Sequence, residues 1–172
     1  MDNITLIGMP GSGKSTVGVL LAKVLGYGFL DTDLLIQQRE GALLQSILDC
    51  RGADYFLAAE EQAVRSVDCS RHVIAPGGSV VYSACAMERL KELGIVVYLE
   101  MPLEELIGRI DNMGSRGVVM EPGQTLSELY EVRVPLYRRY ADYTVACGGQ
   151  TLEQTVGAVL SCLDHRTPAS GV

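Results

Sequence analysis

The chain has 172 residues, of which 48% are hydrophobic and 20% are charged, and its formal net charge is -7. This length suits one domain with a sizeable core, and the composition is that of a globular protein. The negative charge argues against a broad attraction to nucleic acid or anionic lipid, so neither is expected as a partner. A local basic pocket remains possible, built from Lys14, Arg109, Arg116, Arg133, Arg138 and Arg139.

Cysteine usage and the first residues bear on the compartment. The five cysteines are scattered and none forms a C-x-x-C pair, so a zinc site is not expected. No signal peptide is evident, and the apolar stretch at residues 4–7 is too short to span a membrane. We therefore expect reduced thiols, a cytoplasmic protein without a membrane partner, and a monomer.

Strand-like and helix-like segments alternate along the chain. We expect strands at residues 3–8, 27–33, 72–79, 95–102 and 142–147. Helical spacing is found at residues 14–26, 34–40, 42–50, 53–67, 85–94, 103–110, 126–141 and 152–163, with breaks at Gly41 and Gly52 and an interruption or kink near Pro135. The alternation predicts an α/β fold whose parallel sheet carries helices on both faces.

Three short motifs follow predicted strands, where open parallel sheets bind ligands. They are "GMPGSGKST" after the first strand, "DTD" after the second and "PGGS" after the third. A fourth segment, residues 112–125, has little periodicity and several glycines, so it is a loop long enough to suspect a function.

The first motif satisfies G-x-x-x-x-G-K-[ST], between a strand and a helix. Glycines let backbone N–H groups turn inward around phosphate oxygens, and the helix N-terminus adds positive potential. Lys14 is expected to neutralise the β- and γ-phosphates, and Ser15 to ligate Mg²⁺. The residues expected to bind ATP here are Gly11, Ser12, Gly13, Lys14, Ser15 and Thr16.

The motif "DTD" is less specific, because a solvated turn or a helix cap has the same composition. Asp31 follows an apolar strand and is a candidate to hold water on the magnesium ion. Asp33 is a candidate to orient an attacking hydroxyl or to accept its proton.

Taken together, the residues from the P-loop to "DTD", the "PGGS" turn, the loop "SRG" and "RVPLYRRYAD" resemble the shikimate kinase family over residues 3–160. The resemblance implies a fold like the nucleoside monophosphate kinases, with a five-stranded parallel sheet. It implies one domain at residues 1–165, an acceptor-binding region at about 33–62, a mobile lid at about 112–124 and a flexible tail at 166–172. It also implies transfer of the γ-phosphate of ATP to a ring hydroxyl of shikimate.

The resemblance also assigns roles to single residues. Asp31 matches the magnesium-associated carboxylate, and Asp33 the carboxylate that binds the acceptor hydroxyls. Gly77 and Gly78 match a glycine turn beside the substrate, and Arg133 an arginine that binds its carboxylate. Two further arginines are expected on the nucleotide side, Arg116 of the lid at the transferring phosphate and Arg109 on adenine.

The chain departs from the family pattern on the acceptor side. The family motif G-E-x-x-F-R-x-x-E is "GADYFLAAE" here, so Leu57 replaces the second carboxylate-binding arginine and Ala53 a glutamate. Ser79 replaces the third glycine of the turn, and "RGVV" replaces R-P-L-L in the lid. Leu57 is thus the residue expected at that substrate contact.

Three interpretations stay open at this point. Arg51 or another arginine reaches in and the acceptor is shikimate, or the acceptor is a different small hydroxy acid such as homoserine. An ammonium-bearing acceptor would have Asp33, Glu60 or Glu61 as a partner. A non-catalytic nucleotide-binding regulator is the third possibility, against which the presence of Asp33, Arg116 and Arg133 argues.

Overall fold

The computed structural model describes residues 3–110 and 117–164. Its centre is one five-stranded sheet in the order β2-β3-β1-β4-β5, and every pair of neighbours is parallel. The strands are β1 (Asn3–Ile7), β2 (Gly28–Asp31), β3 (His72–Ala75), β4 (Gly94–Glu100) and β5 (Tyr143–Ala146). Every residue of β1 is buried, as expected for a central strand covered on both faces.

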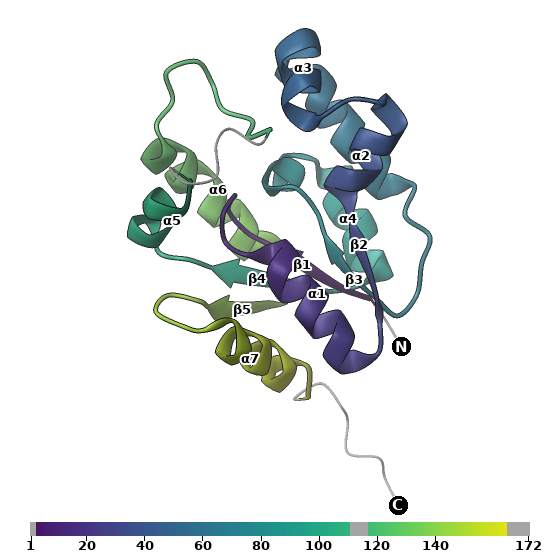
Figure 1. Cartoon of the computed structure of the whole chain (residues 1–172), viewed down its shortest axis with the longest axis vertical. Coiled ribbons are helices and arrows are strands. Elements are labelled where there is room, and N and C mark those ends of the chain that lie inside the picture. The colour runs from purple at the N-terminus through teal and green to yellow at the C-terminus, as the bar shows by residue number, and fades with distance from the viewer. Residues whose placement is uncertain (1–2, 111–116, 165–172) are drawn as a thin grey trace, which may run out of the picture.

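Helices cover both faces of this sheet (Figure 1). Helices α1 (Lys14–Leu25) and α7 (Leu152–Asp164) contact each other on one face, and α4 (Ala84–Leu93) and α6 (Leu126–Tyr140) lie on the other. The remaining helical elements are α2 (Thr32–Glu40), α3 (Leu44–Arg65), the 3-10 helix η1 (Gly78–Tyr82) and α5 (Leu103–Ile110). The predicted α/β fold with a five-stranded parallel sheet is confirmed.

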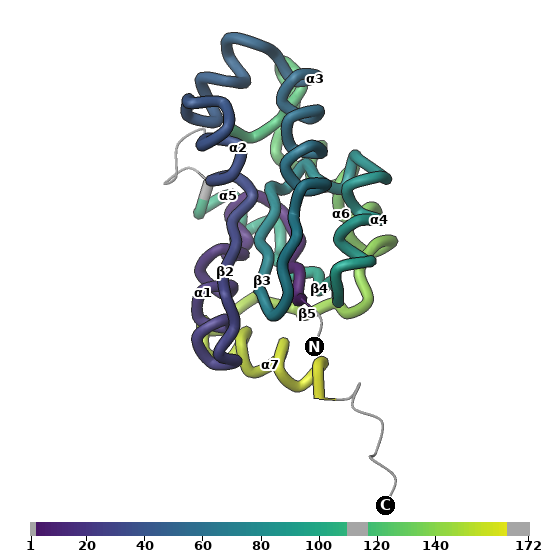
Figure 2. Tube along the Cα trace, turned by 90° about the vertical axis from the view of Figure 1, so that its right-hand side faces the viewer, coloured from purple at the N-terminus to yellow at the C-terminus, as the bar shows by residue number. Residues whose placement is uncertain are grey.

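Helix α2 and the first part of α3 extend beyond the sheet (Figure 2), and a second, small core lies between α2, both parts of α3 and Val119. This core is formed by Ile36, Ile47, Phe56, Ala63 and Val119. The two glycines predicted to break the helical path do so, since Gly41 ends α2 at φ 63° and Gly52 leaves the helical region at φ 81° within α3. The bend at Gly52 directs the second half of α3 back along the sheet and over its ligand-binding edge.

One sequence-based expectation about the helices is only partly met. Helix α6 continues through Pro135 without an interruption. The side of α6 that carries Pro135 is exposed, so water can satisfy the carbonyl that the missing N–H would have bonded. Arg133 and Tyr137 are buried on the opposite side of the same helix.

None of the helices in residues 3–110 and 117–164 has the length and apolar character that a membrane span requires.

Candidate active site

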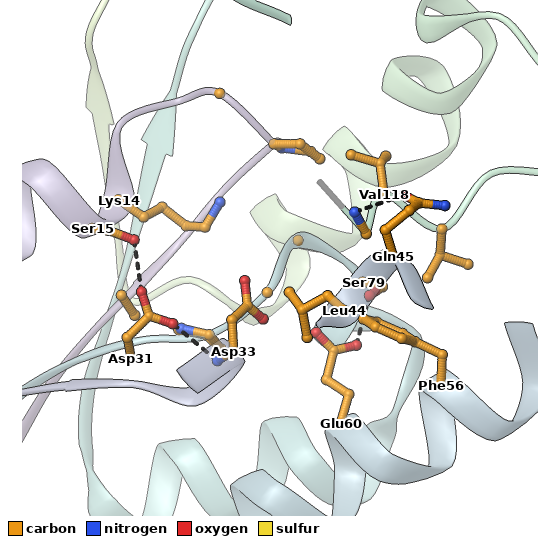
Figure 3. A pocket seen from close by; sticks show the side chains of 18 of the residues that line it. Lys14, Ser15, Asp31, Asp33, Leu44, Gln45, Phe56, Glu60, Ser79 and Val118 are labelled. Carbon is orange, nitrogen blue, oxygen red and sulfur yellow. Dashed lines mark hydrogen bonds between the residues drawn. The ribbon is translucent and has the colours of Figure 1, made fainter. Parts of the chain in front are cut away.

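A cavity of about 920 Å³ lies beyond the carboxyl ends of β1, β2 and β3. The three motifs that follow these strands line it, as the sequence predicts (Figure 3). Helix α3 closes one side through Phe56 and Glu60, and α6 contributes Arg133. Residues 117–124 of the predicted lid are described, and of these Gly117, Val118 and Val119 line the cavity.

The phosphate-binding loop connects β1 to α1. Gly13 stands at the start of α1 with φ 91°, a left-handed conformation that a residue with a side chain rarely adopts. The Nζ atom of Lys14 donates to the carbonyls of Gly8 and Met9, at 3.0 Å each. Desolvation within the site lowers the pKa of Lys14 to about 8, although Asp33 counteracts the shift. Lys14 is therefore mostly protonated at neutral pH and lies where a phosphate would bind.

Ser15 and Asp31, the two residues expected at magnesium, are brought together. The Ser15 hydroxyl donates to Oδ2 of Asp31 over 3.0 Å, and both residues line the cavity. Mg²⁺ usually keeps several water ligands and takes one or two protein oxygens besides the phosphates. This hydroxyl–carboxylate pair fits such an ion, and the described residues contain no denser group of metal-binding side chains.

Asp33 is the second residue of α2, where its backbone N–H donates to Oδ1 of Asp31 at 2.9 Å. Burial raises the pKa of Asp33 to about 6, the Asp31 carboxylate adds to the rise, and Lys14 opposes it. A carboxylate with a pKa closer to neutrality is a better proton acceptor than one in water. Its position between Lys14 and the "PGGS" turn suits a group that receives the proton of an acceptor hydroxyl (Figure 3).

Arg133 is almost completely buried, with 1% of its surface exposed. Its Nε atom donates to the Tyr82 hydroxyl at 3.1 Å, and its Nη2 atom donates to the Val119 carbonyl at 2.7 Å. The Nη1 atom faces Gly78, because a Cβ atom on that glycine would lie 3.1 Å from it. Arg133 thus keeps one nitrogen directed at the cavity while two others hold it in place.

Tyr137 supports the same turn from one helical turn further along α6. The sequence predicts a packing role, and the Tyr137 ring does stack on Tyr98 with centroids 5.2 Å apart. Its hydroxyl also donates to the Gly78 carbonyl at 2.6 Å. That second role was missed, since spacing along a helix does not reveal which backbone a side chain meets.

Two further side chains belong to the site, and their contact with each other was not predicted. Glu60 of α3 is 1% exposed, and the hydroxyl of Ser79 donates to its Oε2 atom over 2.6 Å. Ser79 is the residue that departs from the glycine turn of the family. Ser79 thus bonds the last glutamate of "GADYFLAAE", which lies one helical turn after Leu57.

Three residues considered for the acceptor side, one expected there and two left open, lie elsewhere. Leu57 does not line the cavity, and it packs against the small core around Ile36 and Phe56. Arg51 does not replace the family arginine, since its exposed side chain bonds the Tyr55 hydroxyl and pairs with Glu40 at 3.6 Å. Glu61, considered as a partner for an ammonium group, instead accepts from Ser83 at 2.7 Å and pairs with Arg65.

The two other arginines predicted at the nucleotide differ in what is described. Arg109 lines the cavity, where its Nη1 atom donates to the Gly11 carbonyl at 3.3 Å, beside the phosphate loop. Arg116 lies outside the described residues, as does part of the predicted lid. The adenine and phosphate contacts of these two residues remain predictions.

Comparison with known proteins agrees with this geometry. The family model for shikimate kinase matches residues 10–164. The chain belongs to the shikimate kinase family. A shikimate kinase of Caldanaerobacter subterraneus subsp. tengcongensis is 34% identical to it over 93% of this chain and 95% of the relative.

Solved structures of the shikimate kinase family agree with the fold in detail. The shikimate kinase from Acinetobacter baumannii in complex with shikimate superposes with a TM-score of 0.87, at 34% identity, over 98% of this chain and 96% of that one. The enzyme from Aquifex aeolicus gives a TM-score of 0.82 at 30% identity, over 98% and 99% of the two chains. As a member of this family the chain is an ATP-dependent small-molecule kinase, so a non-catalytic regulator is no longer a candidate.

Proposed function

We propose that this kinase transfers the γ-phosphoryl group of magnesium-bound ATP to a hydroxyl of shikimate. The observation that carries the proposal is the meeting of Lys14, Asp33 and Arg133 around one cavity. A phosphate-binding ammonium, a proton acceptor and a carboxylate-binding guanidinium are the three groups that phosphorylation of a hydroxy acid requires. The resemblance in fold to a shikimate-bound kinase supports shikimate as that acid.

Lys14 and the N–H groups at the start of α1 would bind the β- and γ-phosphates and counter the charge that builds up during transfer. Ser15 and Asp31 would hold the magnesium ion, directly or through water. The ion would supply positive charge that partly neutralises the phosphates. Arg109 beside Gly11 would pack on the adenine, and Arg116 of the lid at residues 112–124 would reach the transferring phosphate.

On the acceptor side, Arg133 would bind the carboxylate through its cavity-facing nitrogen, beside the backbone of Gly77 and Gly78. Asp33 would then orient the acceptor hydroxyl and accept its proton. The hydroxyl oxygen forms a bond to the γ-phosphorus while the bond from that phosphorus to the β–γ bridging oxygen breaks, which yields ADP. No covalent bond to the protein is needed. Much of the rate acceleration therefore comes from holding the acceptor hydroxyl in line with the phosphorus–oxygen bond that breaks.

The proposal also covers the domain organisation, the oligomeric state and the cellular compartment of the enzyme. We take residues 1–165 as one domain, with the acceptor region at 33–62 and the tail at 166–172. A monomer suffices, since every group in this mechanism comes from one chain. The five cysteines all carry free thiols, in keeping with a cytoplasmic enzyme.

A second acceptor is favoured by one observation. Among the described residues that line the cavity, Arg133 is the one arginine on the acceptor side, because Leu57 and Arg51 both lie elsewhere. An amino acid such as homoserine carries an ammonium group beside its carboxylate, so it has no net negative charge and needs less cationic compensation than shikimate does. We keep such an acceptor as the alternative.

The test is a screen of the purified protein with ATP and Mg²⁺ against shikimate, homoserine and a panel of small hydroxy acids. ADP release is followed by a coupled assay, and the phosphorylated product is identified by mass spectrometry. We expect shikimate to be turned over with a KM in the ordinary metabolite range of about 1 μM–1 mM. Turnover of another hydroxy acid with shikimate inert would establish the alternative.

A further inference from the structure

Glu60 and Ser79 form a buried polar pair on the acceptor side of the cavity, and both residues line it. Ser79 donates to Oε2 of Glu60 at 2.6 Å (Figure 3). The other oxygen, Oε1, has no hydrogen-bond partner among the described residues. A buried polar atom left without a partner costs stability, so it commonly marks a place where a ligand binds.

The direction of Oε1 follows from Gly77. A Cβ atom on Gly77 would collide with Oε1 of Glu60 and would also come within 3.0 Å of Oδ1 of Asp33. The absence of a side chain at Gly77 therefore leaves the two carboxyl groups facing the same space, beside the turn that is expected to contact the acceptor. Oε1 of Glu60 is thus next to the proton acceptor of the proposed reaction.

Among the described residues, no cation lies within ion-pair distance of this carboxyl, and its one hydrogen bond comes from a neutral hydroxyl. The charged and titratable groups that surround it are Lys14 of α1, Asp33 of α2, and Arg133 and Tyr137 of α6. An ionised carboxylate that is buried without a close cation has a high free energy, so this environment favours the neutral acid. Burial raises the pKa of Glu60 to about 7, with the Ser79 hydrogen bond working against the rise and Asp33 adding to it.

We propose that Glu60 is a specificity-determining residue of the acceptor site, which binds anionic hydroxy acids as a neutral carboxylic acid whose Oε1 hydrogen-bonds the bound acceptor while Ser79 fixes Oε2. The neutral form helps a site with one described acceptor-side arginine to bind an anion, because it leaves Asp33 as the one ionised carboxylate of this facing pair. This inference rests on the proposed function in one respect, which is that the acceptor must be an anion.

The proposal predicts how acceptor binding depends on pH. Below the pKa of Glu60 the carboxyl is neutral and can donate to the acceptor. Above it, the ionised group repels an anionic acceptor and can no longer donate, so the acceptor Kd rises by up to about tenfold per pH unit. Binding of ATP is expected to lack this dependence, since Glu60 lies on the acceptor side.

The experiment uses shikimate as the probe and measures its Kd by calorimetry and its KM by kinetics from pH 6 to pH 9. Three proteins are compared: the natural chain, Glu60→Gln, and the matched control Glu61→Gln, whose side chain bonds Ser83 outside the cavity. We expect the natural chain and Glu61→Gln to lose affinity together above pH 7. Glu60→Gln, which stays neutral, should match the natural chain within a few-fold at pH 6 and then change much less. Titration of Asp33 and Lys14 is common to all three, so the difference between the curves belongs to Glu60.

Ser79→Ala provides a second readout. Since the Ser79 hydrogen bond lowers the pKa of Glu60, its loss should move the loss of affinity to higher pH. A role for Ser79 in packing alone would leave that pH unchanged. This variant also decides the question if Glu60→Gln does not fold.

Thermal unfolding separates this inference from the proposed function. The folded-state pKa of Glu60 is raised above its unfolded value, so the natural chain loses stability between pH 4.5 and pH 7 and Glu60→Gln does not lose that part. The Tm of Glu60→Gln relative to the natural chain should therefore rise by several degrees from pH 5 to pH 8. If this difference appears but shikimate is inert, the proposed acceptor fails and the neutral acid stands. If shikimate is turned over and the Kd curves of the natural chain and Glu60→Gln are parallel, the inference is overturned.

Discussion

The two halves of the cavity are built in different ways. The phosphate-binding half comes from one continuous segment and the end of β2, and the Lys14 side chain bonds two backbone carbonyls of that segment. The acceptor half is assembled from α2, α3, η1 and α6, with side chains that meet across 19 to 59 residues of sequence. A backbone-based site tolerates little change, whereas a site of side chains can lose one partner and gain another. The replacement of an arginine at Leu57 together with the appearance of Ser79 fits the second kind.

The largest effect is expected at Lys14. Lys14→Ala removes the ammonium that counters phosphate charge, so kcat should fall by roughly a thousandfold or more. Turnover is measured at saturating ATP and acceptor, and circular dichroism checks that the fold persists. Lys23→Ala, on the same helix but exposed, is the control. Turnover of Lys14→Ala close to that of the natural chain would mean that the phosphate-binding half is wrongly assigned.

Asp33 lies where the two halves meet. Asp33→Asn cannot accept a proton, so kcat should fall by about 10²–10⁴-fold. Because the pKa of Asp33 is raised to about 6, the rate of the natural chain should fall as the pH drops below 6 and Asp33 becomes protonated. The pH–rate profile of Asp33→Asn should lack this acidic limb. A limb that survives in the variant would belong to another group.

Arg133 tests the acceptor half alone. Arg133→Ala removes the one acceptor-side arginine among the described cavity residues, and we expect the acceptor KM to rise by about 10–100-fold while the KM for ATP changes by less than about twofold. Arg133→Lys should recover part of the loss, because it keeps the charge but not the fork of donors. Arg139→Ala, exposed on the same helix, is the control. Efficient phosphorylation of shikimate by Arg133→Ala would remove this residue from the acceptor site.

The smallest effect is expected at Tyr137. Tyr137→Phe keeps the ring that stacks on Tyr98 but removes the hydrogen bond to the Gly78 carbonyl. The free energy of unfolding should fall by about 1 kcal/mol, and the acceptor KM should rise a few-fold. Chemical denaturation and steady-state kinetics measure the two. An increase in the KM for ATP instead would show that the turn serves the nucleotide.

The sequence predicted best those features that depend on residues close together in the chain. A strand, a glycine loop and a helix with Lys14 form the same structure wherever they occur together, so the phosphate-binding half could be predicted in detail. The break at Gly52 was also predictable, because glycine reaches the left-handed region without strain. The sequence also placed Ser15 and Asp31 at the same edge of the sheet, where the structure joins them by a hydrogen bond.

The acceptor half was harder because its contacts depend on how separate elements approach. Glu60 and Ser79 are 19 residues apart, and neither segment alone predicts the hydrogen bond between them. The error at Leu57 has a simpler reason. Phe56 and Glu60, four residues apart, share the face of α3 that lines the cavity, while Leu57 is turned about 100° away from Phe56. An arginine has the length to reach around that angle, and a leucine does not.

The two internal hydrogen bonds of Arg133 have a further consequence for affinity. A free arginine side chain has about 2 kcal/mol of rotamer entropy, which a ligand usually has to suppress when it binds. Here the bonds to Tyr82 and to the Val119 carbonyl immobilise the guanidinium when the chain folds. The acceptor therefore meets a rigid cation, and its binding entropy should be more favourable than that for a surface arginine.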